Sequence, residues 1–168
     1  VLDIAGGSPE IRMLEFERPL GKGGAIWHGF NAARGRVMIF VDADNMVGPS
    51  QADLLLDSLD SYHVAIADRF SRPHSDGGQS PGRKLISILG RVWIRMVLGL
   101  RHSDTQCGAK AFRADAWRLI GPHVREKGWA FDLDVLNHAR LLSLRVDEVS
   151  VLWRHVPQGS KVRMITAV

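Results

Sequence analysis

Two aspartates stand one residue apart directly after an apolar run, in the stretch IFVDADN at residues 39–45. Like charges beside a buried strand repel each other and lose hydration, which is unfavourable unless a cation lies between the carboxylates. Alternate residues of a strand point to the same side, so Asp42 and Asp44 can converge on a hard cation such as Mg²⁺ or Mn²⁺. The motif therefore predicts a metal site that can neutralise a diphosphate. A helix cap, which often has a similar sequence, is the alternative.

Strand-like and helix-like segments alternate along the chain. Continuous apolar runs at 37–41 and 63–67 are typical of parallel strands that are covered on both faces. Further strands are predicted at 11–16, 106–113 and 145–153, and helices at 49–59, 114–120 and 131–142. This order predicts a doubly wound, mostly parallel α/β sheet, in which ligands bind at the carboxyl ends of the strands. Asp42 and Asp44 lie at such an end.

Length and charge limit the possible partners. A chain of 168 residues with 45% hydrophobic content is expected to form a single domain over residues 1–168. Its net charge of +4 favours nucleotides, phosphorylated substrates, nucleic acid or an anionic membrane surface. The lone Cys107 fits a reducing compartment. No apolar run of membrane-spanning length and no signal-peptide pattern occurs, so we expect the chain not to span a membrane.

A glycine-rich segment, GKGGA at 21–25, precedes a predicted helix that ends at Gly35. It places Lys22 with Gly23 and Gly24 in a loop at a helix N-terminus, an arrangement that suits a phosphate or a nucleotide. The spacing of a P-loop is absent. A tight turn with an ordinary capping lysine is the alternative interpretation.

A second acidic segment, GWAFDLDVL at 128–136, places Asp132 in the first turn of a predicted helix. The helix dipole favours negative charge there, so Asp132 is either a capping residue or a carboxylate at the mouth of a site. In the second case it would serve as a general base or would position an acceptor.

The segment RKLISILGRVWIRMVLGL at 83–100 predicts an amphipathic helix. Its apolar stripe is formed by residues 85, 88, 89, 92 and 96 and is widened by 86, 93 and 97. Lys84, Arg91 and Arg95 share another face. Two interpretations stay open: a helix that lies on an anionic membrane, or one that faces the core and has a solvated basic side.

Five segments together resemble inverting family 2 glycosyltransferases, and more closely the polyprenyl- and dolichyl-phosphate β-glucosyltransferases. They are GKGGAIWHGFNAARG, VMIFVDADN, DTQCGAKAFR, GWAFDLDVL and WRHVPQGSKVR, in the family's order and spacing. The resemblance implies a GT-A nucleotide-diphosphosugar transferase fold. It also implies metal-dependent transfer of a hexose, with glucose favoured, from a nucleotide-diphosphate sugar to a polyprenyl or dolichyl phosphate.

The resemblance also assigns roles to residues by matching position. Asp42 and Asp44 would hold Mg²⁺ or Mn²⁺ on the donor diphosphate, and Asp132 would be the catalytic carboxylate next to the acceptor. Arg83 and Lys84 would meet the acceptor phosphate. The implied donor-binding residues are Lys22, Gly23, Gly24, Asp42, Asp104, Gln106, Lys161 and Arg163.

The chain departs from the family pattern in two places. The opening strand, the Pro-x-Tyr-Asn-Glu-like loop and the strand that ends in Asp-Asp-Gly-Ser are absent, so we expect a partial catalytic domain that lacks its first strands. Some mannosyl relatives have a third metal ligand, Gln, where this chain has Met46. That difference favours UDP-glucose over GDP-mannose as the donor.

Two other functions remain open from the sequence. One is a related transferase with a soluble acceptor such as a phosphoglycerate. The other is a basic nucleic-acid-binding module, which is disfavoured because the basic residues are not interleaved with aromatic ones. Under the first-ranked interpretation the acceptor is a lipid phosphate at a membrane surface, no nucleic acid binds, and the enzyme is cytoplasmic and peripheral to the membrane.

Overall fold

The computed structural model describes residues 11–43, 47–71, 90 and 92–152, and these residues form an α/β fold. Its sheet has four strands in the order β1-β3-β2-β4. The strands are β1 (Val37–Val41), β2 (Val64–Asp68), β3 (Ala109–Arg113) and β4 (Val146–Ser150). The helices include α2 (Gly21–Ala32), α3 (Pro49–Ser58), α5 (Ala114–Ile120), the short 3-10 helix η1 (Gly121–His123) and α6 (Phe131–Leu141).

The sheet is mixed, and the prediction of a mostly parallel sheet was wrong in this respect. Strand β3 pairs antiparallel with β1 and with β2, and only β2 and β4 pair in parallel. An apolar run shows that a strand is buried on both faces but carries no information on its direction. Strands β1, β2 and β4 run in the same direction, so their carboxyl ends still lie at one edge of the sheet. Strand β3 runs the other way and begins at that edge.

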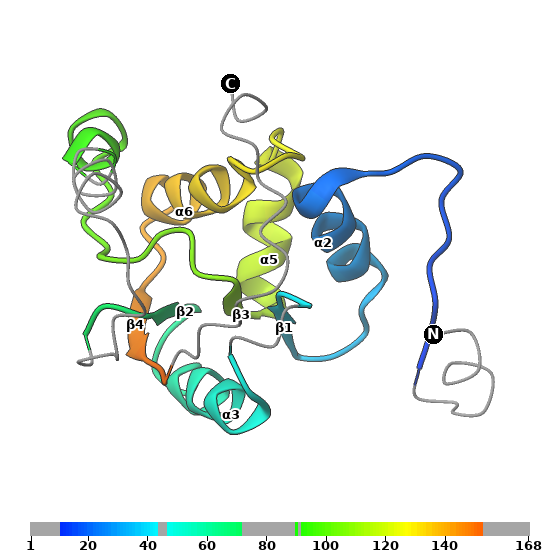
Figure 1. Cartoon of the computed structure of the whole chain (residues 1–168), viewed down its shortest axis with the longest axis horizontal. Coiled ribbons are helices and arrows are strands. Elements are labelled where there is room, and N and C mark those ends of the chain that lie inside the picture. Colours follow the sequence, from blue (N-terminus) through cyan, green and yellow to red (C-terminus); the bar gives the residue numbers. More distant parts are fainter. Residues whose placement is uncertain (1–10, 44–46, 72–89, 91, 153–168) are drawn as a thin grey trace, which may run out of the picture.

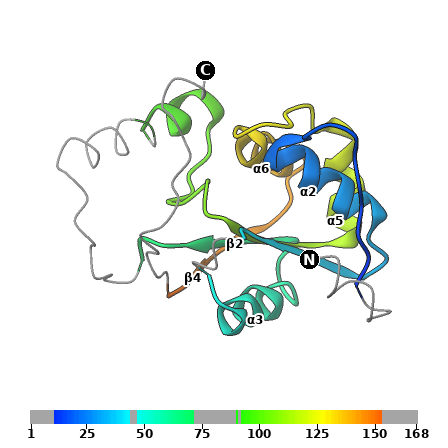
Figure 2. The ribbon, with the colours of Figure 1, turned by 45° about the vertical axis from the view of Figure 1, so that its right-hand side comes forward.

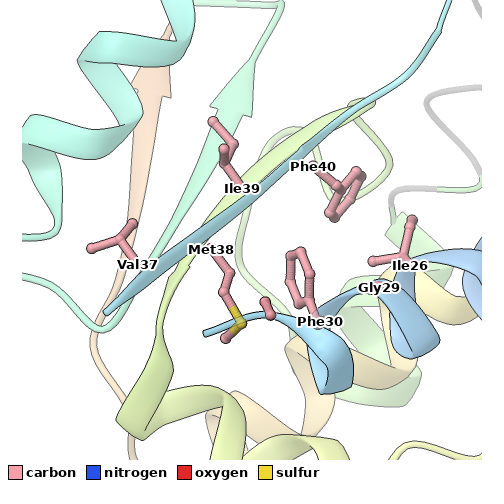
Figure 3. Close-up of a pocket in the computed structure, with 8 residues that line it drawn as sticks. Ile26, Gly29, Phe30, Val37, Met38, Ile39 and Phe40 are labelled. Atoms are coloured by element: carbon pink, nitrogen blue, oxygen red, sulfur yellow. The ribbon is translucent and has the colours of Figure 1, made fainter. Parts of the chain in front are cut away.

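Helices cover both faces of the sheet, as the strand–helix alternation predicted (Figures 1 and 2). Helices α2, α5 and α6 lie on one face and α3 lies on the other. Strand β1 shows how the residues alternate: Met38 and Phe40 face α2, while Ile39 packs with the core on the α3 side (Figure 3). Both sides of each interior strand are thus buried, which explains the continuous apolar runs.

Two local predictions near the N-terminus were wrong. Residues 11–16 form no strand, and the side chains of Ile11, Leu14 and Phe16 remain exposed because no strand lies beside them in the described part. The GKGGA segment is not a loop, because α2 begins at Gly21. The backbone N–H of Gly24 donates to the Lys127 carbonyl at 2.9 Å, which fixes this first turn against the segment before α6.

Of the predicted amphipathic helix at 83–100, the structure describes residues 90 and 92–100, and residues 90 and 92–98 are helical. The predicted stripe is rotated, because Ile94 and Leu98 pack against the core while Val92, Trp93, Met96 and Val97 are exposed. The helix at 92–98, green in Figure 1, lies away from the sheet. Among the described residues, none of the helices combines the length and the apolar character needed to cross a bilayer.

Candidate active site

Asp42 follows β1 directly, at the edge where the carboxyl ends of β1, β2 and β4 meet. Its backbone N–H donates to the carbonyl of Gly108 at 2.7 Å, which ties the end of β1 to the start of β3. A Cβ at Gly108 would collide with the Asp42 carboxylate, so glycine leaves the space that this side chain occupies. About one third of the Asp42 side chain is exposed, 36%. The carboxylate is therefore fixed in position and open to a ligand.

Lys22, in the first turn of α2, lies between two carboxylates. Its Nζ is 3.2 Å from Asp42 Oδ1 and 3.3 Å from Asp132 Oδ2. Burial acts to lower the pKa of Lys22, but the charges of Asp132 and Asp42 outweigh it, so the pKa is raised above its ordinary value. Lys22 thus remains an ammonium at neutral pH and bridges the two acids.

Asp132, in the first turn of α6, is buried and holds two lysines. Its Oδ1 lies 2.6 Å from Nζ of Lys110 on β3, while Oδ2 faces Lys22. Lys110 is fully buried and also donates to the carbonyl of Cys107 at 2.7 Å. The charges of Asp42, Lys22, Asp132 and Lys110 therefore alternate from the exposed edge into the core.

A second ion pair lies at the same edge of the sheet. Arg69 follows β2, and its Nε and Nη2 donate to the two carboxylate oxygens of Asp104 at 2.6 and 2.8 Å. Burial opposes the guanidinium charge, but the hydrogen bond to Asp104 raises the pKa of Arg69. This two-point contact fixes the plane of the guanidinium group. Asp104, predicted to bind the donor, is therefore buried against Arg69.

The segment around Ser103 is held by buried and half-buried carboxylates. Glu148 accepts from the Ser103 N–H at 2.5 Å and from its hydroxyl at 2.8 Å. Burial acts to raise the pKa of Glu148, but hydrogen bonds from His102 and Ser103 lower it to about 2. Asp68, at the end of β2, lies 3.1 Å from the same hydroxyl and also pairs with the Ser71 hydroxyl. These contacts anchor the loop that carries Asp104.

The structure brings together Lys22, Asp42 and Asp132 of the predicted site residues. Gln106 lies in an exposed turn and takes no part in this cluster among the described contacts. Gly23 and Gly24 are buried where α2 meets Phe131 and Leu20. The remaining predicted positions lie outside the described residues: Asp44, Met46, Arg83, Lys84, Lys161 and Arg163.

Sequence reasoning missed Lys110 and Arg69. Lys110 is the one charged residue inside the buried core of the strand sequence AKAF, and such a residue in a buried strand needs a partner. Arg69 directly follows a strand that is buried throughout, at the edge where ligands bind in this fold class. Both signals were present in the sequence.

Of the two predicted metal ligands, Asp42 lies within the described residues. Asp42 offers hard carboxylate oxygens, and the ammonium of Lys22 beside it shows that this position favours a cation. No group of three or more His, Cys, Asp or Glu side chains within the described ranges could hold a metal. Asp42 thus fits as one ligand, and the predicted set needs Asp44, outside those ranges.

Comparisons with known proteins show the family to which this chain belongs. The family model of glycosyl transferase family 2 matches residues 1–123. The dolichyl-phosphate beta-glucosyltransferase of Drosophila melanogaster is 33% identical over 93% of this chain and 50% of that protein. The enzyme of the same name from Saccharomyces cerevisiae is 28% identical over 92% of this chain and 50% of its own length. The chain thus spans about half the length of these curated relatives.

Solved structures show the same fold. Glucosyl-3-phosphoglycerate synthase from Mycobacterium tuberculosis, in complex with phosphoglyceric acid, superimposes with a TM-score of 0.61 at 20% identity over 90% of this chain and 50% of that one. A structure of that synthase with Mn²⁺ and UDP-glucose gives a TM-score of 0.58 at 19% identity, with the same coverage. Because the family model covers most of the sequence, the chain belongs to glycosyl transferase family 2.

Proposed function

We propose that this protein transfers a hexose, with glucose favoured, from a nucleotide-diphosphate sugar to a polyprenyl or dolichyl phosphate with inversion. The observation that carries the proposal is the cluster of Asp42, Lys22 and Asp132 at the carboxyl edge of the sheet, in a family 2 chain. The family membership favours a transferase over the nucleic-acid-binding module that charge alone left open. Residues 1–168 are then part of one catalytic domain.

The donor diphosphate binds at the Asp42 end of the cluster. Asp42 and Asp44 would hold Mg²⁺ or Mn²⁺, and the metal would supply charge neutralisation for the nucleotide diphosphate. Lys22 contributes a positive charge within reach of the same position, because its ammonium already contacts Asp42. The proposed donor-binding set also contains Gly23, Gly24, Asp104, Gln106, Lys161 and Arg163. Of these, Asp104 forms an ion pair with Arg69.

The acceptor needs little help from a base. A phosphate monoester has a second pKa of about 6, so it is largely a dianion at neutral pH and can attack the anomeric carbon directly. Asp132 is 2% exposed and both of its oxygens contact lysines. We therefore assign Asp132 to holding Lys22 in the site rather than to removing a proton. Arg83 and Lys84 are the proposed contacts of the acceptor phosphate.

UDP-glucose is the proposed donor. Met46 stands where some mannosyl relatives have a metal-binding Gln, which argues against GDP-mannose. The names of the curated relatives specify glucosyl transfer, and the M. tuberculosis synthase of the same fold was solved with UDP-glucose. These findings support the donor class and leave its confirmation to experiment.

A lipid acceptor is supported by the surface of the helix at 92–98. Val92, Trp93, Met96 and Val97 leave large apolar side chains exposed there, next to the exposed Arg95. Apolar side chains beside basic ones suit the boundary of an anionic bilayer. The proposed location is thus peripheral, at the cytoplasmic face of a membrane.

A soluble acceptor is the second candidate, favoured by the fold likeness to a synthase solved with phosphoglyceric acid. The test is transfer from radiolabelled UDP-glucose by the protein at its natural length, offered polyprenyl phosphate in detergent or 3-phosphoglycerate in water. We expect label in the lipid phase, with Mn²⁺ required. Label in phosphoglycerate alone would favour the second candidate, and label in neither acceptor would contradict the proposed transfer to a phosphorylated acceptor.

The metal assignment has its own test. Asp44→Ala is expected to abolish metal-dependent donor binding and to leave the fold intact. Asp53→Ala, at an exposed position on α3, is the control and should bind donor normally. Unchanged donor affinity of Asp44→Ala in the presence of Mn²⁺ would remove Asp44 from the metal site.

A further inference from the structure

Lys110 is a charged residue in the interior of the fold, and none of the predicted roles includes it. It lies on β3 between Phe40 of β1 and Ile66 of β2, so its backbone is paired on both sides. Its side chain is fully buried. Burial of an ammonium is unfavourable unless acceptors surround it. The buried ammonium of Lys110 therefore depends on its acceptors, one of which is the carboxylate of Asp132.

The contacts of Lys110 divide the carboxylate of Asp132 between two partners. Oδ1 accepts from Lys110 Nζ at 2.6 Å, and the carbonyl of Cys107 accepts from the same ammonium at 2.7 Å. Oδ2 is left to face Lys22 at 3.3 Å. The contact to Lys110 is the shorter one and comes from an interior strand. The contact with Lys110 thus fixes Oδ1 of Asp132, which leaves Oδ2 of Asp132 directed toward Lys22.

We propose that Lys110 is a positioning residue, which holds Asp132 so that its second oxygen places Lys22 beside Asp42. The inference rests on the proposed function, because Lys22 matters only if an anionic donor binds at Asp42. Lys110 itself touches no substrate. Its effect passes through Asp132 to Lys22, whose side chain is only 17% exposed, so that the position of its ammonium depends on the neighbouring carboxylates.

A purely structural role of the buried pair makes a different prediction. In that case Lys110→Met lowers the melting temperature, but the molecules that remain folded bind donor with the ordinary affinity. If Lys110 instead acts through Lys22, its replacement weakens donor binding, and the effect disappears once Lys22 is gone. A double-mutant cycle separates the two roles, because residues in one network are not additive.

The experiment is calorimetric titration of UDP with Mn²⁺ into the protein at its natural length. Lys110→Met should weaken UDP binding by about fivefold or more, and by less than about twofold when Lys22→Met is already present. Lys127→Met is the matched control. The ammonium of Lys127 lies over the Trp27 ring at 3.9 Å and donates to the Val124 carbonyl, and among the described contacts it meets neither Asp42 nor Asp132. Its backbone carbonyl, which accepts from Gly24, stays in place in this variant, so UDP affinity should be unchanged.

A second variant guards against failure to fold. Lys110→Met leaves the Asp132 carboxylate buried without this partner, whereas Lys110→Met with Asp132→Asn removes both charges. The double variant should lose as much UDP affinity as Lys110→Met alone. Adding Lys22→Met to the double variant should cause no further loss. Ordinary affinity of the folded double variant, or equal losses with and without Lys22, would overturn the positioning role. Absence of UDP binding by the unaltered protein would instead overturn the proposed function, and this role with it.

Discussion

Alanine at Gly23 should destabilise the protein, because Gly23 is the point where α2 touches α6. A Cβ built there lies 2.7 Å from Cγ and 2.8 Å from Cδ2 of Phe131, and closer still to its Cβ. Phe131 is buried, so its ring cannot move aside without disturbing the core. Such overpacking costs about 1–3 kcal/mol of unfolding free energy.

Gly29 in the same helix is the matched control. A Cβ at Gly29 meets no atom within 4 Å, and it would point toward the apolar hollow of about 420 Å³ between α2 and β1 (Figure 3). Replacing a helical glycine by alanine gains about 0.5–1 kcal/mol. The same substitution should therefore have opposite signs at the two positions.

Thermal unfolding followed by circular dichroism measures both effects. In a protein of this size 1 kcal/mol shifts the melting temperature by about 2–4 °C, so Gly23→Ala should lower it by about 2–12 °C. Gly29→Ala should raise it by about 1–4 °C. A melting temperature of Gly23→Ala equal to or above that of the unaltered protein would refute the packing argument. If that stable variant also lost UDP binding, Gly23 would be a donor-loop residue, as the sequence resemblance implied.

Three further results are expected. Because the pKa of Glu148 is lowered to about 2, its ionised form stabilises the fold above about pH 4.5, and this contribution is lost as the pH falls toward 2. In urea titrations Glu148→Gln should thus be less stable by up to about 2 kcal/mol at pH 7, a figure discounted for partial exposure. The difference should shrink as the pH falls from about 4.5 through 2, and a difference that stays constant over this range would contradict the reasoning. Asp104→Asn should lower the unfolding free energy by about 2–3 kcal/mol through loss of its contacts with Arg69, and unchanged stability would show that the pair is not formed. Burial and the Asp104 charge raise the pKa of Cys107 to about 11, so iodoacetamide should modify it at pH 7 only after unfolding; rapid modification of the native protein would count against its burial.

The sequence predicted the local elements of the fold well and the pairing of strands poorly. The strand at 37–41 and the helix at 114–120 have the predicted bounds, because apolar runs and helical periods are local properties. The reversed direction of β3 depends on where a long connection returns to the sheet, which no local pattern records. Residues 11–16 carry a strand-like pattern but find no strand beside them in the described part.

The candidate site divides in the same way. The position of Asp42 at the end of a buried strand and of Asp132 in a first helical turn followed from the sequence pattern. The contacts of Asp132 with Lys110 and of Asp104 with Arg69 join residues that are 22 and 35 positions apart. Such contacts depend on the order of strands in the sheet, so only the structure could show them.

Asp42 marks the proposed binding site of a metal and a nucleotide-sugar. Calorimetric titration of UDP-glucose, and separately of GDP-mannose, with and without Mn²⁺ into the protein at its natural length tests it most directly. We predict that UDP-glucose binds only when Mn²⁺ is present and that Asp42→Asn removes this binding. Failure of both donors to bind, or binding that needs neither Mn²⁺ nor Asp42, would contradict the account.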